Sequence, residues 1–451
     1  MNTWTPVMRA ALIALLPLAA AWPAAAADLP ATKILFVGNS YTFGRVDPVM
    51  SYNAAAVHDL TKAFNDISPT GTNSYPIGTV GFGSFEQHPW GGVPGIFKKM
   101  TDEAGLNYDV SLSTRNAATL RGQFLNTANA AWDLRGNVAS QKWDSVVLQA
   151  QSDEPLPLGK GKNANPLTFA AYANQFEKYI HTGRVDGTLS VANGTVSYTE
   201  TQLFGSLAGC TSTGLTSGSC GTSRVVPLNA NFNASTKVYV EETWARPDMV
   251  EAHKVTTPDL NSANGAPIVD TTGTGGASGT AATLYYTSAA STAANLAAMT
   301  ADMHAAFYGL AAANSGITGV IPVGDAFQRA VDQGLVLGSG FYKADGTFVE
   351  PTNGTINLWW LDRTHASVYG SYLSALTTFG RITGLDPRGL GAGELAGADL
   401  GISASVVLAL EAVAAEQLGF AAAVPEPATS ALMGGGVLAL LTAAKRRRAQ
   451  R

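Results

Sequence analysis

Short hydrophobic runs alternate along the chain with longer segments in which hydrophobic residues recur every three or four positions. The short runs predict buried β-strands, and the longer segments predict helices that bury one face. The expected strands span 33–37, 108–112, 143–148, 237–240 and 319–323. The expected helices span 93–104, 169–181, 292–312 and 366–383, with one more from residue 323 through Ala330 and helical structure in the Gly/Ala-rich stretch 384–423. Strands that alternate with helices favour an α/β fold with a parallel sheet covered on both faces.

Two segments interrupt this alternation. Residues 182–235 and 255–290 are rich in Gly, Ser, Thr and Asn, and their hydrophobic residues show little periodicity. This composition is typical of turns and loops. We therefore expect both segments to be surface insertions with short β-hairpins, and not a separate domain.

The N-terminus has the layout of an export signal. A single cation, Arg9, precedes an apolar run at 10–21, and small residues follow up to Ala27. This order is typical of a secretory signal peptide, here predicted at 1–27. The alternative is a membrane anchor, for which the apolar run is short.

The C-terminus has three parts. Residues 424–427 read Val-Pro-Glu-Pro, residues 428–444 are mostly apolar, and 445–451 contain five cations. An apolar stretch followed by clustered positive charge predicts a transmembrane segment whose basic end stays in the cytoplasm. The three parts in this order resemble the PEP-CTERM sorting signal. The resemblance implies processing by an exosortase, transient anchoring in the inner membrane, and delivery to the periplasm, the cell surface or the extracellular matrix of bacteria that make exopolysaccharide. The alternative is an ordinary tail anchor.

One predicted domain, 28–423, lies between these two ends. Its charge and its cysteines limit the kinds of partner and cofactor that we expect. The whole chain has a net charge of −5, and six of its 28 Lys and Arg residues lie in its two ends, so the domain between them is more acidic. An acidic surface disfavours nucleic acid and anionic membranes as partners. Export makes a disulfide between Cys210 and Cys220 plausible; the alternative is two unpaired thiols. The histidines show no metal-binding spacing, so no metal or organic cofactor is expected.

Three short motifs carry residues that could perform chemistry. Ser40 follows the first predicted strand, and ligands of open α/β sheets bind beyond the carboxyl ends of strands. Asp362 and His365 are three residues apart, a spacing that lets a carboxylate orient the base that a serine nucleophile requires. Gln149 and Gln151 follow the third predicted strand, where an amide could donate to an oxyanion. The structural alternatives are a helix-capping turn, a capping aspartate beside a surface histidine, and polar residues that merely end a strand.

Taken together, these motifs resemble the SGNH (GDSL-like) hydrolase superfamily. Residues 38–42, Gly-Asn-Ser-Tyr-Thr, match its first block, and residues 362–365, Asp-Arg-Thr-His, match its last. Residues 146–152 are similar to the third block, with glutamine in place of the usual asparagine. Residues 114–119 are the candidate second block, with alanine where the superfamily has glycine.

The resemblance implies a three-layer α/β/α, flavodoxin-like fold and assigns roles to individual residues. Ser40 would be the nucleophile, His365 the general base, and Asp362 the group that orients His365. The Ser40 N–H, an N–H near Ala117, and the side chain of Gln151 or Gln149 would hold the oxyanion. The segments 242–246 and 322–326 also resemble parts of this superfamily that line the cleft, although core packing is the preferred interpretation of Trp244. Asp153 and Glu154 are adjacent acids, which we expect to be a solvated loop and not a glycosidase pair.

These inferences together predict an exported serine esterase that removes acyl groups such as acetyl from an extracellular carbohydrate. A first alternative is a catalytically weak or inactive surface or biofilm-matrix protein on the same scaffold, because fold does not fix function. A second alternative is a lipase or thioesterase that acts on longer acyl chains.

Overall fold

The computed structural model describes residues 30–45, 47–61, 89–127, 133–254, 280–343, 349–352 and 354–421. The predicted signal peptide, the C-terminal sorting segment 424–451 and most of the predicted insertion 255–290 lie outside these residues. Among the described helices, none combines the length and hydrophobicity needed to cross a membrane.

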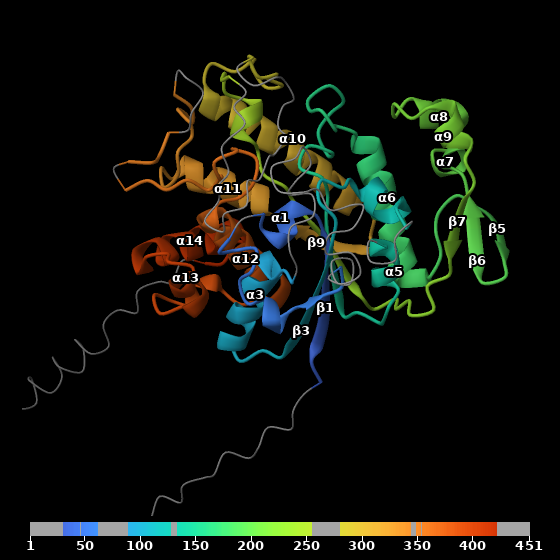
Figure 1. The fold of residues 1–451 in the computed structure, drawn as a ribbon, viewed down its shortest axis with the longest axis horizontal. Helices are drawn as coiled ribbons and strands as arrows, with labels where there is room; N and C mark the ends of the chain where they lie inside the picture. Colours follow the sequence, from blue (N-terminus) through green and yellow to red (C-terminus); the bar gives the residue numbers. More distant parts are fainter. Residues whose placement is uncertain are drawn as a thin grey trace, which may run out of the picture.

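A six-stranded parallel sheet forms the centre of the molecule (Figure 1). Its order is β2 (His58–Asp59), β3 (Tyr108–Thr114), β1 (Thr32–Gly38), β4 (Ser145–Gln149), β8 (Lys237–Glu241) and β9 (Ile317–Ile321). Every neighbouring pair is parallel. Without the two-residue edge strand β2, the strands follow the order 2-1-3-4-5, which is the flavodoxin-like arrangement. The predicted fold class is therefore confirmed.

The sheet separates two hydrophobic clusters, because successive side chains of a strand point to opposite faces. In β1, Ile34 and Phe36 belong to one cluster, and Leu35 and Val37 belong to the other. The first face is covered by α3 (Gly92–Glu103), α11 (Val323–Asp332), α12 (Val368–Thr383), α13 (Leu395–Asp399) and α14 (Ala404–Gln417). The second face is covered by α4 (Leu120–Leu125), α5 (Leu134–Val138) and α6 (Pro166–Thr182), and α10 (Thr292–Ala313) contributes to both clusters. The short elements α1 (Ser40–Phe43), η1 (Ala54–Ala56), η3 (Pro247–Met249) and η4 (Pro387–Gly389) lie in the connections.

The insertion predicted at 182–235 folds into a small antiparallel sheet with three short helices, at one end of the molecule (Figure 1). It comprises β5 (Thr188–Ala192), β6 (Thr195–Tyr198), α7 (Glu200–Leu203), α8 (Leu207–Thr211), α9 (Ser217–Gly221) and β7 (Arg224–Pro227). Val196, Tyr198 and Val226 are fully buried and join the second hydrophobic cluster, so the insertion packs onto the main body.

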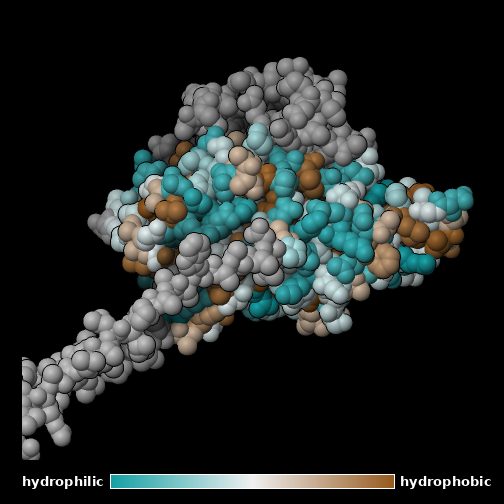
Figure 2. Space-filling view, turned by 90° about the horizontal axis from the view of Figure 1, so that it is seen from below, coloured by the Kyte–Doolittle hydropathy of each residue, from teal (hydrophilic) through white to brown (hydrophobic). Residues whose placement is uncertain are grey.

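A disulfide between Cys210 and Cys220 joins α8 to α9, which confirms that prediction. Five large hydrophobic residues of the insertion are exposed: Leu189, Val191, Leu207, Val225 and Phe232. Hydrophobic residues also gather at this end of the molecule in Figure 2.

Most predicted elements are present, with two kinds of difference. The four short elements β2, α1, α4 and α5 were not predicted, because two to six residues carry too little periodicity to be recognised. The last strand ends at Ile321, two residues earlier than expected. Pro322 follows it, and a proline has no N–H to donate to a neighbouring strand.

Candidate active site

Loops from four distant parts of the chain meet in one pocket at the carboxyl edge of the sheet. Ser40 follows β1, Ala117 follows β3, and Gln151 follows β4. His365 reaches the same pocket from the loop before α12. Because β1 has β3 on one side and β4 on the other, the pocket lies where the strand order reverses, which is where open α/β sheets bind ligands.

Ser40, His365 and Asp362 form a continuous hydrogen-bonded chain. The Nε2 atom of His365 lies 2.8 Å from the Oγ atom of Ser40, although the two residues are 325 positions apart. The Nδ1 atom of His365 lies 2.5 Å from Asp362 Oδ2. An ionised carboxylate only accepts hydrogen bonds, so Nδ1 carries the proton and Nε2 is left to accept from the serine hydroxyl. Ser40 and His365 are 5% and 3% exposed, respectively, which strengthens these contacts by excluding water.

The turn at 362–365 keeps the Asp362 carboxylate ionised. Asp362 Oδ1 accepts the backbone N–H of Thr364 at 3.0 Å and that of His365 at 2.9 Å. Arg363, which lies between Asp362 and Thr364 in the turn, has a φ of 56°, in the left-handed region. Burial by itself would raise the pKa of Asp362, but the charge of His365 and the hydrogen bonds from His365 and Thr364 outweigh it and hold that pKa below its ordinary value. The carboxylate can therefore stabilise an imidazolium at neutral pH.

The sequence around Ser40 fixes its position at the end of β1. Asn39 caps α1 by accepting the N–H of Tyr41, and its own N–H donates to Gln149 Oε1 at 2.9 Å. The Asn39 amide also donates to the carbonyl of Ala150 at 3.2 Å. Gly38 is required here, because a Cβ atom at this position would lie 2.1 Å from the Thr42 hydroxyl oxygen. The local sequence thus ties the serine turn to the loop after β4.

The candidate oxyanion donors are placed differently from one another. Ala117 lines the pocket and has a φ of 54°, in the left-handed region that favours glycine. Gln151 also lines the pocket. Gln149 is fully buried and is absent from the pocket lining, because its side chain holds Asn39 and Thr42. This placement favours Gln151 over Gln149 as the amide that faces a substrate.

Tyr41, Trp244 and Arg246 support the site, although the sequence predicts no catalytic role for them. Trp244 is 1% exposed and stacks on Tyr41 with ring centroids 4.0 Å apart, as expected from core packing. Tyr41 and Trp244 donate to the same carbonyl oxygen, that of Thr364, at 2.7 and 3.0 Å. Arg246 donates to the hydroxyls of Ser152 and Thr364 at 2.8 and 3.0 Å. They therefore hold the His365 turn against the loops after β1 and β4.

Two expectations about neighbouring segments are wrong. Asp153 and Glu154 are 1% and 0% exposed, so they are not a solvated loop. Glu154 accepts the N–H of Leu120 at the start of α4, and burial raises the pKa of Glu154 to about 8. Neither 242–246 nor 322–326, both expected to line the cleft, is part of the pocket lining. Residues 322–326 begin α11, where Gly324 packs against the backbone of Thr243.

One group of described side chains has the composition of a metal site. The potential ligand atoms of Glu242, His304 and Asp325 lie within 4.8 Å of one another. His304 Nδ1 and Asp325 Oδ2 are already paired at 2.9 Å, and none of the three lines the Ser40 pocket. The Ser40–His365–Asp362 arrangement contains its own nucleophile, base and carboxylate and can act without this group.

Replacing Arg246 with alanine is expected to lower the free energy of unfolding by about 3–5 kcal/mol, because it leaves a carboxylate buried without its cation. Arg246 and Asp248 pair at 2.6 Å, and both side chains are 4% exposed. Urea denaturation of the variant measures the loss. Arg329→Ala is the matched control: Arg329 pairs with Glu416 at the surface, so about 1 kcal/mol or less is expected. Equal losses in the two variants would contradict the structural role of Arg246.

Comparison with known proteins identifies one segment clearly. Residues 423–448 match the PEP-CTERM protein-sorting motif. A solved DUF4886 family protein from Bacteroides uniformis is similar at 13% identity, over 86% of this chain and 95% of its own, with a TM-score of 0.39. A proposed SGNH hydrolase from Slackia heliotrinireducens is similar at 14% identity, over 78% of this chain and 99% of its own, with a TM-score of 0.32.

No curated protein matches the chain. The two structural similarities are too weak to support an activity, so the function is argued from the geometry of this chain. The sorting motif directs export to the cell envelope or the extracellular space and implies processing by an exosortase. The chain is therefore a flavodoxin-like α/β protein that carries a PEP-CTERM sorting motif at its C-terminus.

Proposed function

We propose that this protein is an exported serine esterase that removes short acyl groups, such as acetyl, from an extracellular carbohydrate. The observation that carries the proposal is the chain of hydrogen bonds from Ser40 through His365 to Asp362, at 2.8 and 2.5 Å. An activated serine requires a base within hydrogen-bond reach, and the base requires an orienting group on its other nitrogen.

The first half of the reaction acylates Ser40. Its Oγ atom attacks the ester carbonyl while His365 Nε2 takes the hydroxyl proton, and Asp362 stabilises the resulting imidazolium. Ser40, Ala117 and Gln151 line the pocket, and in this proposal the backbone N–H groups of Ser40 and Ala117 and the side chain of Gln151 donate to the oxyanion. When the tetrahedral intermediate collapses, His365 returns the proton to the departing alcohol oxygen.

The second half of the reaction releases the acid. Water attacks the acyl-enzyme carbonyl, His365 accepts a proton from the water, and Ser40 Oγ leaves as the protonated hydroxyl. The cycle consumes one water and requires no cofactor, and the enzyme returns to its starting protonation state.

The size of the pocket supports a short acyl group. The space in front of Ser40 has a volume of about 10 Å³, close to the minimum that holds one water molecule. A methyl group is of similar size, whereas the long chains of lipids and acyl thioesters require an extended apolar groove. This favours an acetyl esterase over the lipase or thioesterase alternative.

The carbohydrate part of the proposal rests on the destination of the protein. Export through a PEP-CTERM motif delivers the chain to a space that exopolysaccharide occupies in the bacteria where such motifs are typical. We extend the proposal to a cleaved signal peptide at 1–27 and a mature domain at 28–423. We also propose transient inner-membrane anchoring through 428–444.

The activity on p-nitrophenyl esters is expected to fall as the acyl chain lengthens. If the small pocket receives the acyl group, kcat/KM should be highest for the acetate and at least about 10-fold lower for the octanoate, because overfilling a packed site costs about 1–3 kcal/mol. Initial rates for the acetate, butyrate, octanoate and laurate measure this. A maximum at octanoate or laurate would support the lipase alternative, and no hydrolysis of any ester would support an inactive matrix protein.

A further inference from the structure

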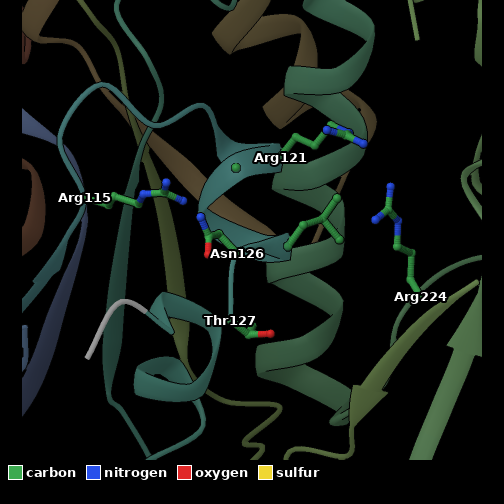
Figure 3. A pocket seen from close by; sticks show the side chains of 7 residues that line it. Arg115, Arg121, Asn126, Thr127 and Arg224 are labelled. Carbon is green, nitrogen blue, oxygen red and sulfur yellow. The ribbon is translucent and has the colours of Figure 1, made fainter. Parts of the chain in front are cut away.

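A second and larger pocket lies on the side of α4, next to the insertion (Figure 3). Its volume is about 580 Å³, within the range of about 300–1,000 Å³ that is typical of small-molecule sites. Three arginines, Arg115, Arg121 and Arg224, line it together with the polar side chains of Asn126 and Thr127. The mechanism proposed above uses none of these residues.

The pocket carries excess positive charge. Arg121 and Arg224 pair with the same carboxylate, that of Glu200, at 2.6 and 2.9 Å, so two guanidinium groups share one negative charge. The side chain of Glu200 is fully buried, and no acidic residue is among the described residues that line the pocket. The Arg115 guanidinium lies against the side chain of Asn126, on the opposite side of the pocket from Arg224 (Figure 3). An anion that enters the pocket would therefore meet positive charge on two sides.

The larger pocket and the Ser40 pocket are lined by consecutive residues of one loop. Arg115 is two residues before Ala117, at most about 7 Å along the chain, and both Asn116 and Ala117 line the Ser40 pocket. The same loop continues into α4, which carries Arg121. One loop therefore contributes residues to the linings of both pockets.

We propose that this pocket is a subsite for an anionic sugar residue, bearing a carboxylate or a sulfate, of the polymer that is deacylated at Ser40. The inference rests on the proposed esterase function and specifies its substrate class. Guanidinium groups bind planar and tetrahedral oxyanions through paired, charge-assisted hydrogen bonds. The rest of the chain is acidic and would repel an anionic polymer. A local positive site would therefore align the polymer so that one of its ester groups lies at Ser40. The insertion, which supplies Arg224 and Glu200, then forms a wall of the substrate site.

The test separates binding from catalysis by using the full chain with Ser40→Ala. Calorimetry measures the affinity of this variant for a mannuronate hexamer, a sulfated galactan hexamer and a neutral cello-hexaose. We expect at least 10-fold tighter binding of an anionic hexamer than of cello-hexaose, weakening as NaCl increases. Tighter binding of the mannuronate hexamer identifies a carboxylate ligand, and tighter binding of the galactan hexamer identifies a sulfate ligand. Equal affinity for all three hexamers would overturn the proposal.

Two changes inside the pocket and one outside it test where the anion binds. Arg115→Gln should weaken binding of the anionic hexamer at least 10-fold. Thr127→Glu, which places a negative charge in the pocket without disturbing the Glu200 pair, should do the same. Arg184→Gln removes an exposed arginine that is absent from the pocket lining and should leave the affinity unchanged. Unchanged binding in the Thr127→Glu variant would overturn the proposal even if Arg115→Gln failed to fold.

The two proposals fail in distinguishable ways. Anion binding that depends on Thr127, in a protein with no esterase activity, would support the subsite and reject the esterase. Hydrolysis of p-nitrophenyl acetate that depends on Ser40, without preferential binding of an anionic hexamer, would support the esterase and reject the subsite.

Discussion

Replacing Ser40 with alanine is expected to lower kcat/KM for p-nitrophenyl acetate by at least about 10³-fold, because removal of one member of a catalytic triad typically costs that much or more. The expectation rests on the position of Ser40 Oγ, which is 2.8 Å from His365 Nε2 and lies in the pocket formed by the loops after β1, β3 and β4. In the Ser40→Ala variant, direct attack on the ester by a water molecule that His365 activates is expected to be much slower than attack by Ser40. Steady-state kinetics of the two purified proteins measure the ratio.

The control for this variant is Ser190→Ala, which removes a serine hydroxyl from an exposed strand of the insertion. Its kcat/KM should equal that of the unsubstituted protein. A Ser40→Ala variant that remains folded and loses less than about 10-fold would mean that another group attacks the ester, since the loss would then be near 1 kcal/mol.

Replacing Asp362 with asparagine is expected to lower kcat by about 10³–10⁴-fold while leaving the fold intact. The substituted amide oxygen can still accept the N–H groups of Thr364 and His365, as Asp362 Oδ1 does. The new NH₂ group, however, faces His365 Nδ1 where a carboxylate oxygen stood. His365 would then carry its proton on Nε2 and could not accept the proton of Ser40. The measurements are kcat and the melting temperature.

Asp386→Asn is the matched control for Asp362→Asn. Asp386 also accepts a hydrogen bond from a backbone N–H two residues later and pairs with a cation, Arg388. It lies beyond the C-terminal end of α12, a helix of 16 residues and thus about 24 Å long, whose first turn follows His365. Its kcat should be unchanged. If Asp362→Asn retained full activity with an unchanged melting temperature, the orienting role of Asp362 would be wrong.

Local patterns in the sequence predict most of the sheet, whereas the pairing of Ser40 with His365 is predicted by the superfamily resemblance. Each of the five longer strands of the main sheet has a short hydrophobic run, and parallel strands bring their carboxyl ends to one edge. The location of Ser40, directly after a strand, is therefore predictable, whereas His365 lies before α12 and 325 residues away. The contact between Asp362 and His365 is also predictable, because the two residues are only three positions apart in one tight turn.

The roles of the residues that support the site are harder to predict from the sequence, because they depend on contacts between distant segments. Nothing local to Arg246 indicates that it reaches Ser152 and Thr364, which lie 94 and 118 residues away. The burial of Glu154 likewise depends on the start of α4, where Leu120 supplies its N–H partner. The sequence does not choose between Gln149 and Gln151 for the same reason: both follow the same hydrophobic run, and only the folded structure shows that Gln151 lines the pocket while Gln149 binds Asn39.

The arginine pocket illustrates the limit of sequence reasoning most clearly. Arg115 and Arg121 belong to the main domain, whereas Arg224 belongs to an insertion whose position on the sheet no periodicity predicts. Ala117 shows the opposite case. The superfamily resemblance indicated a glycine position, and the φ of 54° explains that preference, because the turn requires the left-handed backbone conformation.

Covalent labelling of Ser40 tests the central claim most directly. The purified protein is treated with a fluorophosphonate, which reacts with activated serines, and is then digested and analysed by mass spectrometry. We predict one modified site, Ser40, and at least 10-fold slower modification in Asp362→Asn, in which His365 cannot accept the serine proton. Modification of a different serine, or no modification while the protein is folded, would contradict the assignment of Ser40 as an activated nucleophile.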